Sequence, residues 1–287
     1  MNDSSDKPGI IPAQGTPDWR VNSRGVYDSD MYSETTHYDD DTEITWWEGR
    51  NVGGVTIGVL QFRGNLPMMP GNMGNASTFN FPLLYREMVC DNIGDIAADE
   101  PTENFTAAAI DAAKWLELQG VRAIIGNCGF WGTYQHVVQS ELEIPFYSSS
   151  LMQLPAMVAS MPKGKKVGVV TANGPQLEKC PAIENCGLSA KDKKEKLVIQ
   201  GVEGDAFKTA LQMTGRYKPA EVTAEVVAAA RKVVENHDIG SILLECTELP
   251  PAAVAVQEAV KLPVWDYTTL TNWVYLGALR RPFTGHM

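Results

Sequence analysis

Two cysteines of this 287-residue chain lie in matching sequence contexts. Cys128 lies in the segment VRAIIGNCGF (121–130), and Cys246 lies in the segment SILLECTELP (241–250). In each segment a short aliphatic run ends in one polar residue, which the cysteine and then a small residue follow. Such a run predicts a buried parallel strand. Each cysteine is therefore expected where its strand ends and the next loop or helix begins.

The spacing of the two cysteines suggests a shared pocket. They lie 118 positions apart (246 minus 128), as matching points of two similar halves would. Ligands of open α/β sheets bind at the carboxyl ends of the strands. One thiolate could remove a proton next to a carboxylate while the other thiol returns a proton on the opposite face, which requires similar pKa values. We expect a following helix N-terminus to lower both thiol pKa values. This chemistry requires no cofactor.

The enediolate that forms during such a proton transfer needs hydrogen-bond donors. Backbone N–H groups of Gly129 and Thr247, next to the two cysteines, are candidates. The hydroxyl groups of Ser149, Ser150 and Thr247 are further candidates. His136 follows Cys128 by two helical turns of sequence and is interpreted as an ordinary residue of a helix surface.

The alternative for any free cysteine is a structural role, because this residue is often buried as a small hydrophobe. The matched contexts of Cys128 and Cys246 favour function, whereas Cys90, Cys180 and Cys186 lack such contexts and are interpreted as structural. Cys180 and Cys186 have no C-x-x-C motif or histidine cluster beside them, so no metal site is predicted. Five cysteines are an odd number, which argues against a disulfide framework and for a reducing compartment.

Composition excludes several classes of partner. Hydrophobic residues make up 44% of the chain, the net charge is −11 and the pI is about 4.9. This charge argues against nucleic acid or an anionic membrane surface as a partner. No apolar run is long enough for a transmembrane helix, and the first residues do not resemble a secretory signal. The expected partner is a small carboxylate substrate, and the expected location is cytoplasmic.

Strand and helix patterns alternate along the chain, which predicts parallel sheets covered by helices. The expected strands are 55–60, 121–126, 144–147, 167–171, 197–199, 241–244 and 262–265, and 81–85 is expected to be either an extended stretch or a further strand. The expected helices are 102–118, 132–141, 151–161, 219–236, 251–260 and 268–280. The predicted fold class is α/β, with two pseudo-symmetric doubly wound parallel-sheet domains and the active site between them.

The expected domains are 51–160, completed by the C-terminal helix 267–287, and 161–266. Residues 1–50 are acidic and rich in turn-forming residues, which predicts a flexible arm. Its Trp46-Trp47 pair is expected to dock on its own domain or on a neighbouring subunit, so a homo-oligomer is predicted. The Gly-, Pro- and Asn-rich loop 63–79 follows the first strand, and we expect it to be functional.

Three segments together resemble the aspartate/glutamate racemase superfamily. They are Asn127-Cys128-Gly129, the SSSLMQLP segment (148–155) and Glu245-Cys246-Thr247-Glu248. This superfamily includes hydantoin racemases, maleate isomerases, arylmalonate decarboxylases and an algal-type dimethylsulfoniopropionate lyase. The resemblance covers about 55–280 and implies two pseudo-symmetric α/β halves with cofactor-free cysteine acid/base catalysis.

Carried over to this chain, the resemblance implies Cys128 and Cys246 as the acid/base pair. It implies that the carboxylate-binding groups come from Asn127, Thr171, Asn173 and Thr247. The segment 70–79 differs from the short first loop of typical aspartate and glutamate racemases. It is more similar to the lyase-containing branch.

Three functions follow as hypotheses. The first is a cofactor-independent racemase or isomerase that moves a proton at a carbon next to a carboxylate. The second is a lyase in which the same deprotonation expels a leaving group, such as a sulfonium held by the aromatic faces of Tyr85, Trp131 or Tyr134. The third is a small-acid binding protein that lacks turnover.

Overall fold

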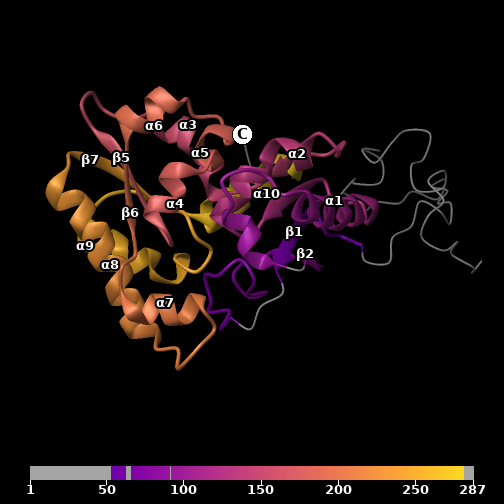
Figure 1. Ribbon diagram of the computed structural model, residues 1–287, viewed down its shortest axis with the longest axis horizontal. Helices are drawn as coiled ribbons and strands as arrows, with labels where there is room; N and C mark the ends of the chain where they lie inside the picture. Colours follow the sequence, from indigo (N-terminus) through magenta and orange to yellow (C-terminus); the bar gives the residue numbers. More distant parts are fainter. Residues whose placement is uncertain (1–52, 63–65, 91, 281–287) are drawn as a thin grey trace, which may run out of the picture.

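The computed structural model describes residues 53–62, 66–90 and 92–280, and its elements form two lobes (Figure 1). The expected arm 1–50 with its two tryptophans, and 281–287 of the expected C-terminal segment, lie outside the described residues. In Figure 1 the elements α7, α8 and α9 lie on one side of the described part of the molecule, and α1, β1 and β2 lie towards the opposite side.

The first lobe contains a four-stranded parallel sheet with the order β2-β1-β3-β4. Its aliphatic runs are buried, which explains why they form strands between layers of helices. The strands are β1 (Ile57–Phe62), β2 (Leu83–Met88), β3 (Ala123–Gly126) and β4 (Phe146–Tyr147). The helices of this half are η4 (Ile93–Ala97), α1 (Glu103–Leu118), η5 (Gly129–Tyr134), α2 (Gln135–Gln139), η6 (Ser150–Gln153) and α3 (Leu154–Ala159).

The second lobe repeats this arrangement with the order β6-β5-β7-β8, again parallel. The strands are β5 (Lys166–Thr171), β6 (Leu197–Gly201), β7 (Ile239–Leu244) and β8 (Val264–Trp265). The helices are α4 (Gly174–Lys179), α5 (Ala182–Asn185), α6 (Ala190–Lys196), α7 (Asp205–Leu211), α8 (Pro219–Asn236), η7 (Pro250–Ala252) and α9 (Ala253–Val260). Because the two strand orders correspond, β3 and β7 are counterparts. The predicted fold class is confirmed.

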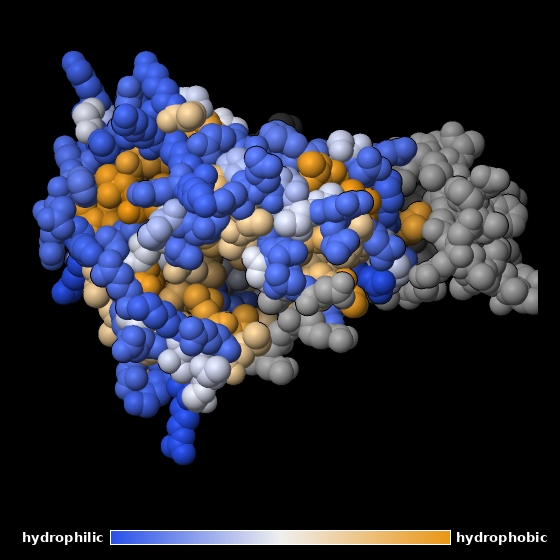
Figure 2. Space-filling model, in the orientation of Figure 1, coloured by the Kyte–Doolittle hydropathy of each residue, from blue (hydrophilic) through white to orange (hydrophobic). Residues whose placement is uncertain are grey.

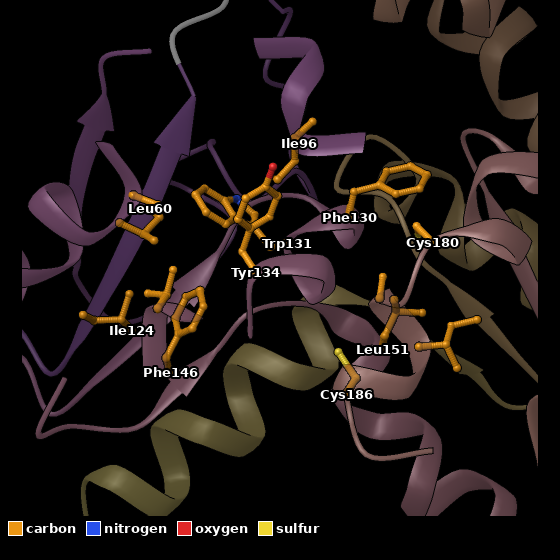
Figure 3. Packing of buried hydrophobic residues seen from close by; sticks show 14 of the residues in the cluster. Leu60, Ile96, Ile124, Phe130, Trp131, Tyr134, Phe146, Leu151, Cys180 and Cys186 are labelled. Atoms are coloured by element: carbon orange, nitrogen blue, oxygen red, sulfur yellow. The ribbon is translucent and has the colours of Figure 1, made fainter. Parts of the chain in front are cut away.

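A buried core connects the lobes. It joins Trp131 and Tyr134, which follow β3, to residues of the second half that include Val169 and Leu243. Figure 3 shows Trp131 and Tyr134 at the centre of this packing. The Trp131 ring stacks on Phe62 with 5.2 Å between ring centroids. Apolar burial across both lobes therefore fixes the position of the segment that carries Cys128.

The C-terminal helix α10 (Tyr267–Ala278) follows the last strand of the second sheet but packs on the first sheet. Its residues Leu270 and Val274 lie in one buried cluster with Ile57 and Val59 of β1. The surface between the two lobes is hollowed, with apolar residues around the hollow (Figure 2). Within the described part of the chain, no helix is long and apolar enough to cross a membrane.

Asp266 fixes the start of α10, and its loss gives a first testable prediction. The side chain accepts hydrogen bonds from the backbone N–H groups of Thr268 (2.7 Å) and Thr269 (3.0 Å), and the Thr269 hydroxyl accepts from the Asp266 N–H (2.9 Å). This arrangement is a capping box. Asp266→Ala is expected to lower the free energy of unfolding by about 1–2 kcal/mol. Urea unfolding checks this, and an unchanged midpoint would show that the cap contributes nothing.

Candidate active site

Cys128 and Cys246 occupy equivalent positions at the ends of the counterpart strands β3 and β7. Each cysteine lies two residues beyond the last residue of its strand, Gly126 or Leu244. The intervening residues are equivalent as well. The N–H of Asn127 donates to the carbonyl of Leu60 in β1 (3.2 Å), and the N–H of Glu245 donates to the carbonyl of Val170 in β5 (2.8 Å).

Two buried hydrogen bonds join the lobes beside the cysteines. The hydroxyl of Thr247, which follows Cys246, donates to the carbonyl of Asn127, which precedes Cys128 (2.8 Å). The hydroxyl of Ser150 donates to the carbonyl of Glu245 (3.0 Å). A negative charge on Cys128 raises the pKa of Cys246, so the two sulfurs lie within electrostatic reach of each other. The structure thus brings the two predicted thiols together.

The sequence predicted that the pKa of each thiol is lowered, and this prediction is wrong. Cys128 is partly buried and Cys246 is 6% exposed. Burial raises the pKa of both thiols, and the charge of Glu245 raises both further. Backbone N–H groups of Phe130, in the first turn of η5, and of Glu248, in the turn after Cys246, lower the two pKa values, but their effect is smaller. Both cysteines are therefore thiols in the resting protein, because the cost of burying a charged thiolate outweighs its stabilisation by these backbone N–H groups.

Several predicted donor groups are already used inside the protein. Besides the Ser150 and Thr247 hydroxyls, the Thr171 hydroxyl donates to Oε2 of Glu245 (2.7 Å). Asn173 is exposed, and its side chain caps α4 by accepting from the N–H of Gln176 (3.2 Å). Only the Ser150 and Thr247 contacts cross between the lobes, and together these contacts leave fewer side-chain donors for a substrate than the sequence suggested.

The other predicted binding residues lie beside Cys128 or above the first sheet. The Asn127 side chain is buried, and its Oδ1 accepts from the Trp131 ring N–H (3.4 Å). Ser149 is buried, and its Oγ accepts from the N–H of Leu151 (3.1 Å). Gly129 is buried against the second lobe, where a Cβ would lie 1.6 Å from Oε1 of Glu245. Gly129 therefore serves close packing between the lobes.

Three acidic groups to which the sequence analysis assigned no role lie within electrostatic reach of the thiols. Glu245 is fully buried, and burial raises its pKa to about 7. Burial also raises the pKa of Glu248. The Tyr267 hydroxyl faces Ser149 without a hydrogen bond of good geometry, and burial raises its pKa, as do the charges of Cys128 and Glu245. Among described residues, no lysine or arginine contributes to the pKa of either thiol.

The loop after β1 reaches this site from the first lobe. Asn72 is 2% exposed, and its Nδ2 donates to Oε1 of Glu248 (2.7 Å). Gly71 has a φ of +100°, and a Cβ there would lie 3.0 Å from the backbone nitrogen of Pro251. Only a residue without a side chain fits that turn comfortably. The loop is therefore an ordered inter-lobe contact within its described part, while 63–65 lie outside the described residues.

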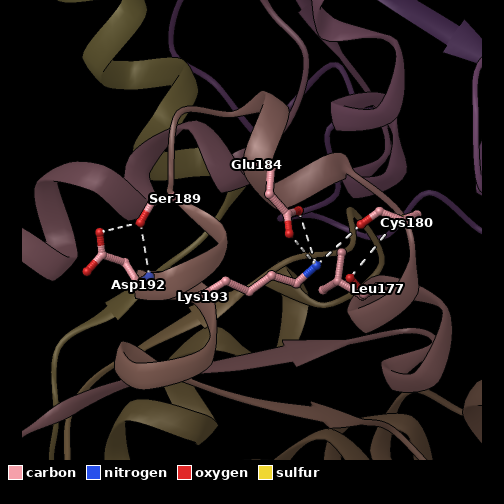
Figure 4. Close-up of polar contacts among 6 residues, drawn as sticks. All are labelled: Leu177, Cys180, Glu184, Ser189, Asp192 and Lys193. Carbon is pink, nitrogen blue, oxygen red and sulfur yellow. Dashed lines mark hydrogen bonds and ion pairs between the residues drawn. The ribbon is translucent and has the colours of Figure 1, made fainter.

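The remaining cysteines have structural surroundings. Cys180 and Cys186 are buried in the inter-lobe core. Lys193 donates to the carbonyl of Cys180 (3.3 Å) and pairs with Glu184 (3.1 Å), as Figure 4 shows. The Cys186 sulfur lies 3.7 Å from the Ser148 hydroxyl. Within the described residues, no group of three or more His, Cys, Asp or Glu side chains is placed to hold a metal ion.

Two of the three aromatic rings proposed to hold a sulfonium are not available to it. Trp131 and Tyr134 are fully buried core residues and offer no free ring face. Tyr85 lies on β2, and its hydroxyl donates to the carbonyl of Met73 (2.9 Å). The prediction that these rings hold a cation is wrong for Trp131 and Tyr134. His136 is exposed on α2, as expected for a helix-surface residue.

Comparison with solved structures agrees with the architecture. An allantoin racemase from Pseudomonas fluorescens matches with a TM-score of 0.54 and 15% identity, over 81% of this chain and 100% of that chain. A glutamate racemase from Campylobacter jejuni subsp. jejuni matches with a TM-score of 0.50 and 10% identity, over 81% of this chain and 89% of that chain. The chain thus has the two-lobed α/β fold of these racemases. No family model matches it.

Sequence relatives define the family more narrowly. Dimethylsulfoniopropionate lyase 7 of Emiliania huxleyi is 30% identical over 231 residues, which are 78% of this chain and 67% of that protein. Lyase 3 of the same organism is 31% identical over 237 residues and 80% of this chain, and the matched part spans 61% of the lyase. A dimethylsulfoniopropionate lyase from Durusdinium sp. clade D is 28% identical over 82% of this chain and 79% of its own length. The chain belongs to the family of these dimethylsulfoniopropionate lyases and has the α/β fold of the racemases.

Proposed function

We propose that this protein is a lyase that cleaves dimethylsulfoniopropionate into dimethyl sulfide and acrylate. The observation that carries this proposal is the similarity of most of the chain to lyases named for that substrate. The substrate carries a carboxylate and a sulfonium on adjacent carbons of a propionate chain. A thiolate removes the proton from the carbon next to the carboxylate, and the electron pair of that C–H bond becomes the C=C bond of acrylate. The C–S bond pair leaves with sulfur, so dimethyl sulfide departs as a neutral molecule.

The charges around the thiols support a cationic substrate. Cys128, Cys246, Glu245, Glu248 and Tyr267 are neutral or anionic, and no lysine or arginine of the described residues contributes to the thiol pKa values. A sulfonium is stabilised in such a field, and its presence lowers the cost of a nearby thiolate. The carboxylate of the substrate would bind backbone N–H groups at Gly129 and Thr247, beside the two cysteines.

Elimination needs only one base. The sulfonium leaves without being protonated, so no general acid is required. Cys128 is the partly exposed thiol, and we assign it the role of base. Cys246, which is 6% exposed, would then hold the substrate from the second lobe. Both cysteines and their neighbours would exclude water from the reacting carbon.

Proton exchange without elimination is the second candidate, and the equivalence of the two cysteines favours it. Two thiols at matching strand ends suit removal of a proton and its return on the opposite face, which is racemisation. This reaction requires both thiols. It would apply to an amino acid or related acid without a leaving group on the adjacent carbon.

Two parallel incubations in deuterated water separate elimination from racemisation. The full chain is mixed with dimethylsulfoniopropionate in deuterated water, headspace dimethyl sulfide is measured by gas chromatography, and acrylate is measured by proton NMR. We expect the two products in equal amounts. A parallel panel of amino acids and hydroxy acids is monitored for deuterium at the carbon next to the carboxylate. Exchange in that panel without any dimethyl sulfide would replace the lyase assignment with the racemase assignment.

A further inference from the structure

Glu245 is the counterpart of Asn127 but carries a carboxyl group. Each residue precedes one of the two cysteines and donates its N–H to the central strand of its sheet. Glu245 is fully buried, whereas glutamates are seldom buried without a paired charge. A carboxyl group at this position has no obvious structural need, because Asn127 serves the same backbone role in the first lobe.

The two oxygens of the Glu245 carboxyl group have different surroundings. Oε2 accepts the hydroxyl hydrogen of Thr171 (2.7 Å). Oε1 has no hydrogen-bond partner among the described residues, although it is buried. It lies against Gly129, so close that a Cβ on that glycine would be 1.6 Å away. A buried oxygen without a partner is costly, which suggests that it takes part in a step that the resting structure does not show.

Within the part of the chain that the structure describes, the titratable groups whose pKa the Glu245 charge shifts are all acids. The charge of Glu245 raises the pKa of Cys128 and Cys246 at the two strand ends, of Cys180 and Cys186 in the core, and of Tyr267 on α10. Thr171 and the backbone N–H of Ala172 lower the pKa of Glu245 itself. No lysine or arginine of the described residues contributes to that pKa. The site therefore favours a single negative charge over two.

We propose that Glu245 and the two thiols share one negative charge and one mobile proton, with Glu245 as the proton acceptor for Cys128. This proposal deepens the proposed lyase function and rests on it for the catalytic step. Above about pH 7 the charge lies on Glu245 before substrate binds. When substrate binds, the Cys128 proton passes to Oε1, directly or through one water molecule, and the thiolate forms without a second charge.

The cycle closes with atoms and charge in balance. The Cys128 thiolate takes the proton from the carbon next to the substrate carboxylate, acrylate and dimethyl sulfide form, and Cys128 is again a thiol. Glu245 then holds the proton that the reaction releases and passes it to solvent. Glu245 does not touch the substrate in this scheme. It is a positioning residue that acts through Cys128.

The pKa of Glu245, raised by burial to about 7, suits this role. Near neutral pH both protonation states of the group are populated. The carboxylate form raises the pKa of Cys128, so uptake of a proton by Glu245 lowers the cost of the thiolate at the moment when it is needed.

Glu245→Gln tests the proposal through two readouts on the full chain. The first is alkylation of Cys128 by iodoacetamide, followed residue by residue by mass spectrometry as pH is raised, which needs no substrate. Because the variant lacks the charge, its Cys128 alkylation profile should move to lower pH by about one unit or more. The second is kcat for dimethylsulfoniopropionate, which should fall about 10²-fold and lose its dependence on a group with a pKa near 7.

A matched control separates charge from burial. Glu117 on α1 is also buried, and its Oε1 accepts from the N–H groups of Glu143 (2.7 Å) and Ile144 (3.1 Å), but it does not contribute to the pKa of either thiol. Glu117→Gln should leave both the Cys128 alkylation profile and the pH dependence of kcat unchanged. A further variant, Thr171→Val, keeps the Glu245 carboxyl group but removes a hydrogen bond that lowers the pKa of that group. The change of kcat with pH that is centred near pH 7 should therefore move to higher pH. This variant decides the matter if Glu245→Gln does not fold.

The outcomes are distinct. An unchanged Cys128 alkylation profile in folded Glu245→Gln would overturn the shared charge, whatever the substrate. A shifted alkylation profile with an unchanged pH dependence of kcat would overturn the role as proton acceptor. Absence of lyase activity in the unsubstituted chain would overturn the proposed function, while the alkylation result would still decide the shared charge.

Discussion

Replacing Cys128 by alanine is expected to lower kcat/KM for dimethylsulfoniopropionate by about 10²–10⁴-fold, because the base is lost. Cys246→Ala is expected to have a smaller effect, since elimination of a sulfonium requires no acid. The partial exposure of Cys128 and the burial of Cys246 support this order. Racemisation would instead require both thiols, so equal losses would favour it.

The experiment compares kcat and KM of the two variants with those of Cys90→Ala as control. Cys90 lies just beyond β2 and is partly buried in the first lobe. Its replacement should leave kcat/KM unchanged. Activity that persists in both Cys128→Ala and Cys246→Ala would remove the cysteines from the mechanism and leave only the fold.

The second large effect is expected at Gly129. The methyl group of alanine would lie 1.6 Å from Oε1, 2.0 Å from Cδ and 2.5 Å from Cγ of Glu245. The Glu245 carboxyl group is buried and accepts from the Thr171 hydroxyl, so either its side chain or the adjoining lobe must shift to make room. Gly129→Ala should lower the free energy of unfolding by about 1–3 kcal/mol. It should also lower kcat by about 10²-fold, because displacement by about 1 Å of the adjacent Cys128 disturbs the reacting geometry.

Urea unfolding and steady-state kinetics on Gly129→Ala measure both effects. The double variant Gly129→Ala/Glu245→Ala removes the clashing carboxyl group. It should regain much of the lost stability while its activity stays low. This non-additivity is the signature of direct contact between the two positions. A Gly129→Ala protein with normal stability and kcat would contradict the close packing of the two lobes at this point.

Periodic patterns determine much of the fold in advance. The helix α8 occupies the residues that its apolar spacing and its N-terminal Pro219 predict, and the aliphatic runs before Cys128 and Cys246 form parallel strands. The short helices α4 to α7 were not predicted. They lie between β5 and α8 in segments that are too short or too polar for a helical stripe of apolar residues to appear. The positions of α4 and α5 depend on contacts with the first lobe, and those of α6 and α7 on packing within the second lobe.

The site was predictable as far as it depends on strand ends. The meeting of Cys128 and Cys246 follows from the equivalence of β3 and β7. The raised thiol pKa values do not follow from sequence, because they depend on how much water the closed lobes exclude. The contact between Gly129 and Glu245 joins residues far apart in the chain and has no signature in spacing. A glutamate at the end of a buried aliphatic run was the available signal for Glu245.

Protection of the two thiols by one ligand tests the central claim most directly. The ligand is the trimethylammonium analogue of the substrate, which has the same charges but a poor leaving group. Alkylation of Cys128 and Cys246 is measured by mass spectrometry over a range of ligand concentrations, with Cys90 as internal reference. We predict that both thiols are protected with the same half-maximal concentration while Cys90 is not. Protection of only one thiol, or of neither at saturation, would show that the two sulfurs do not share a substrate.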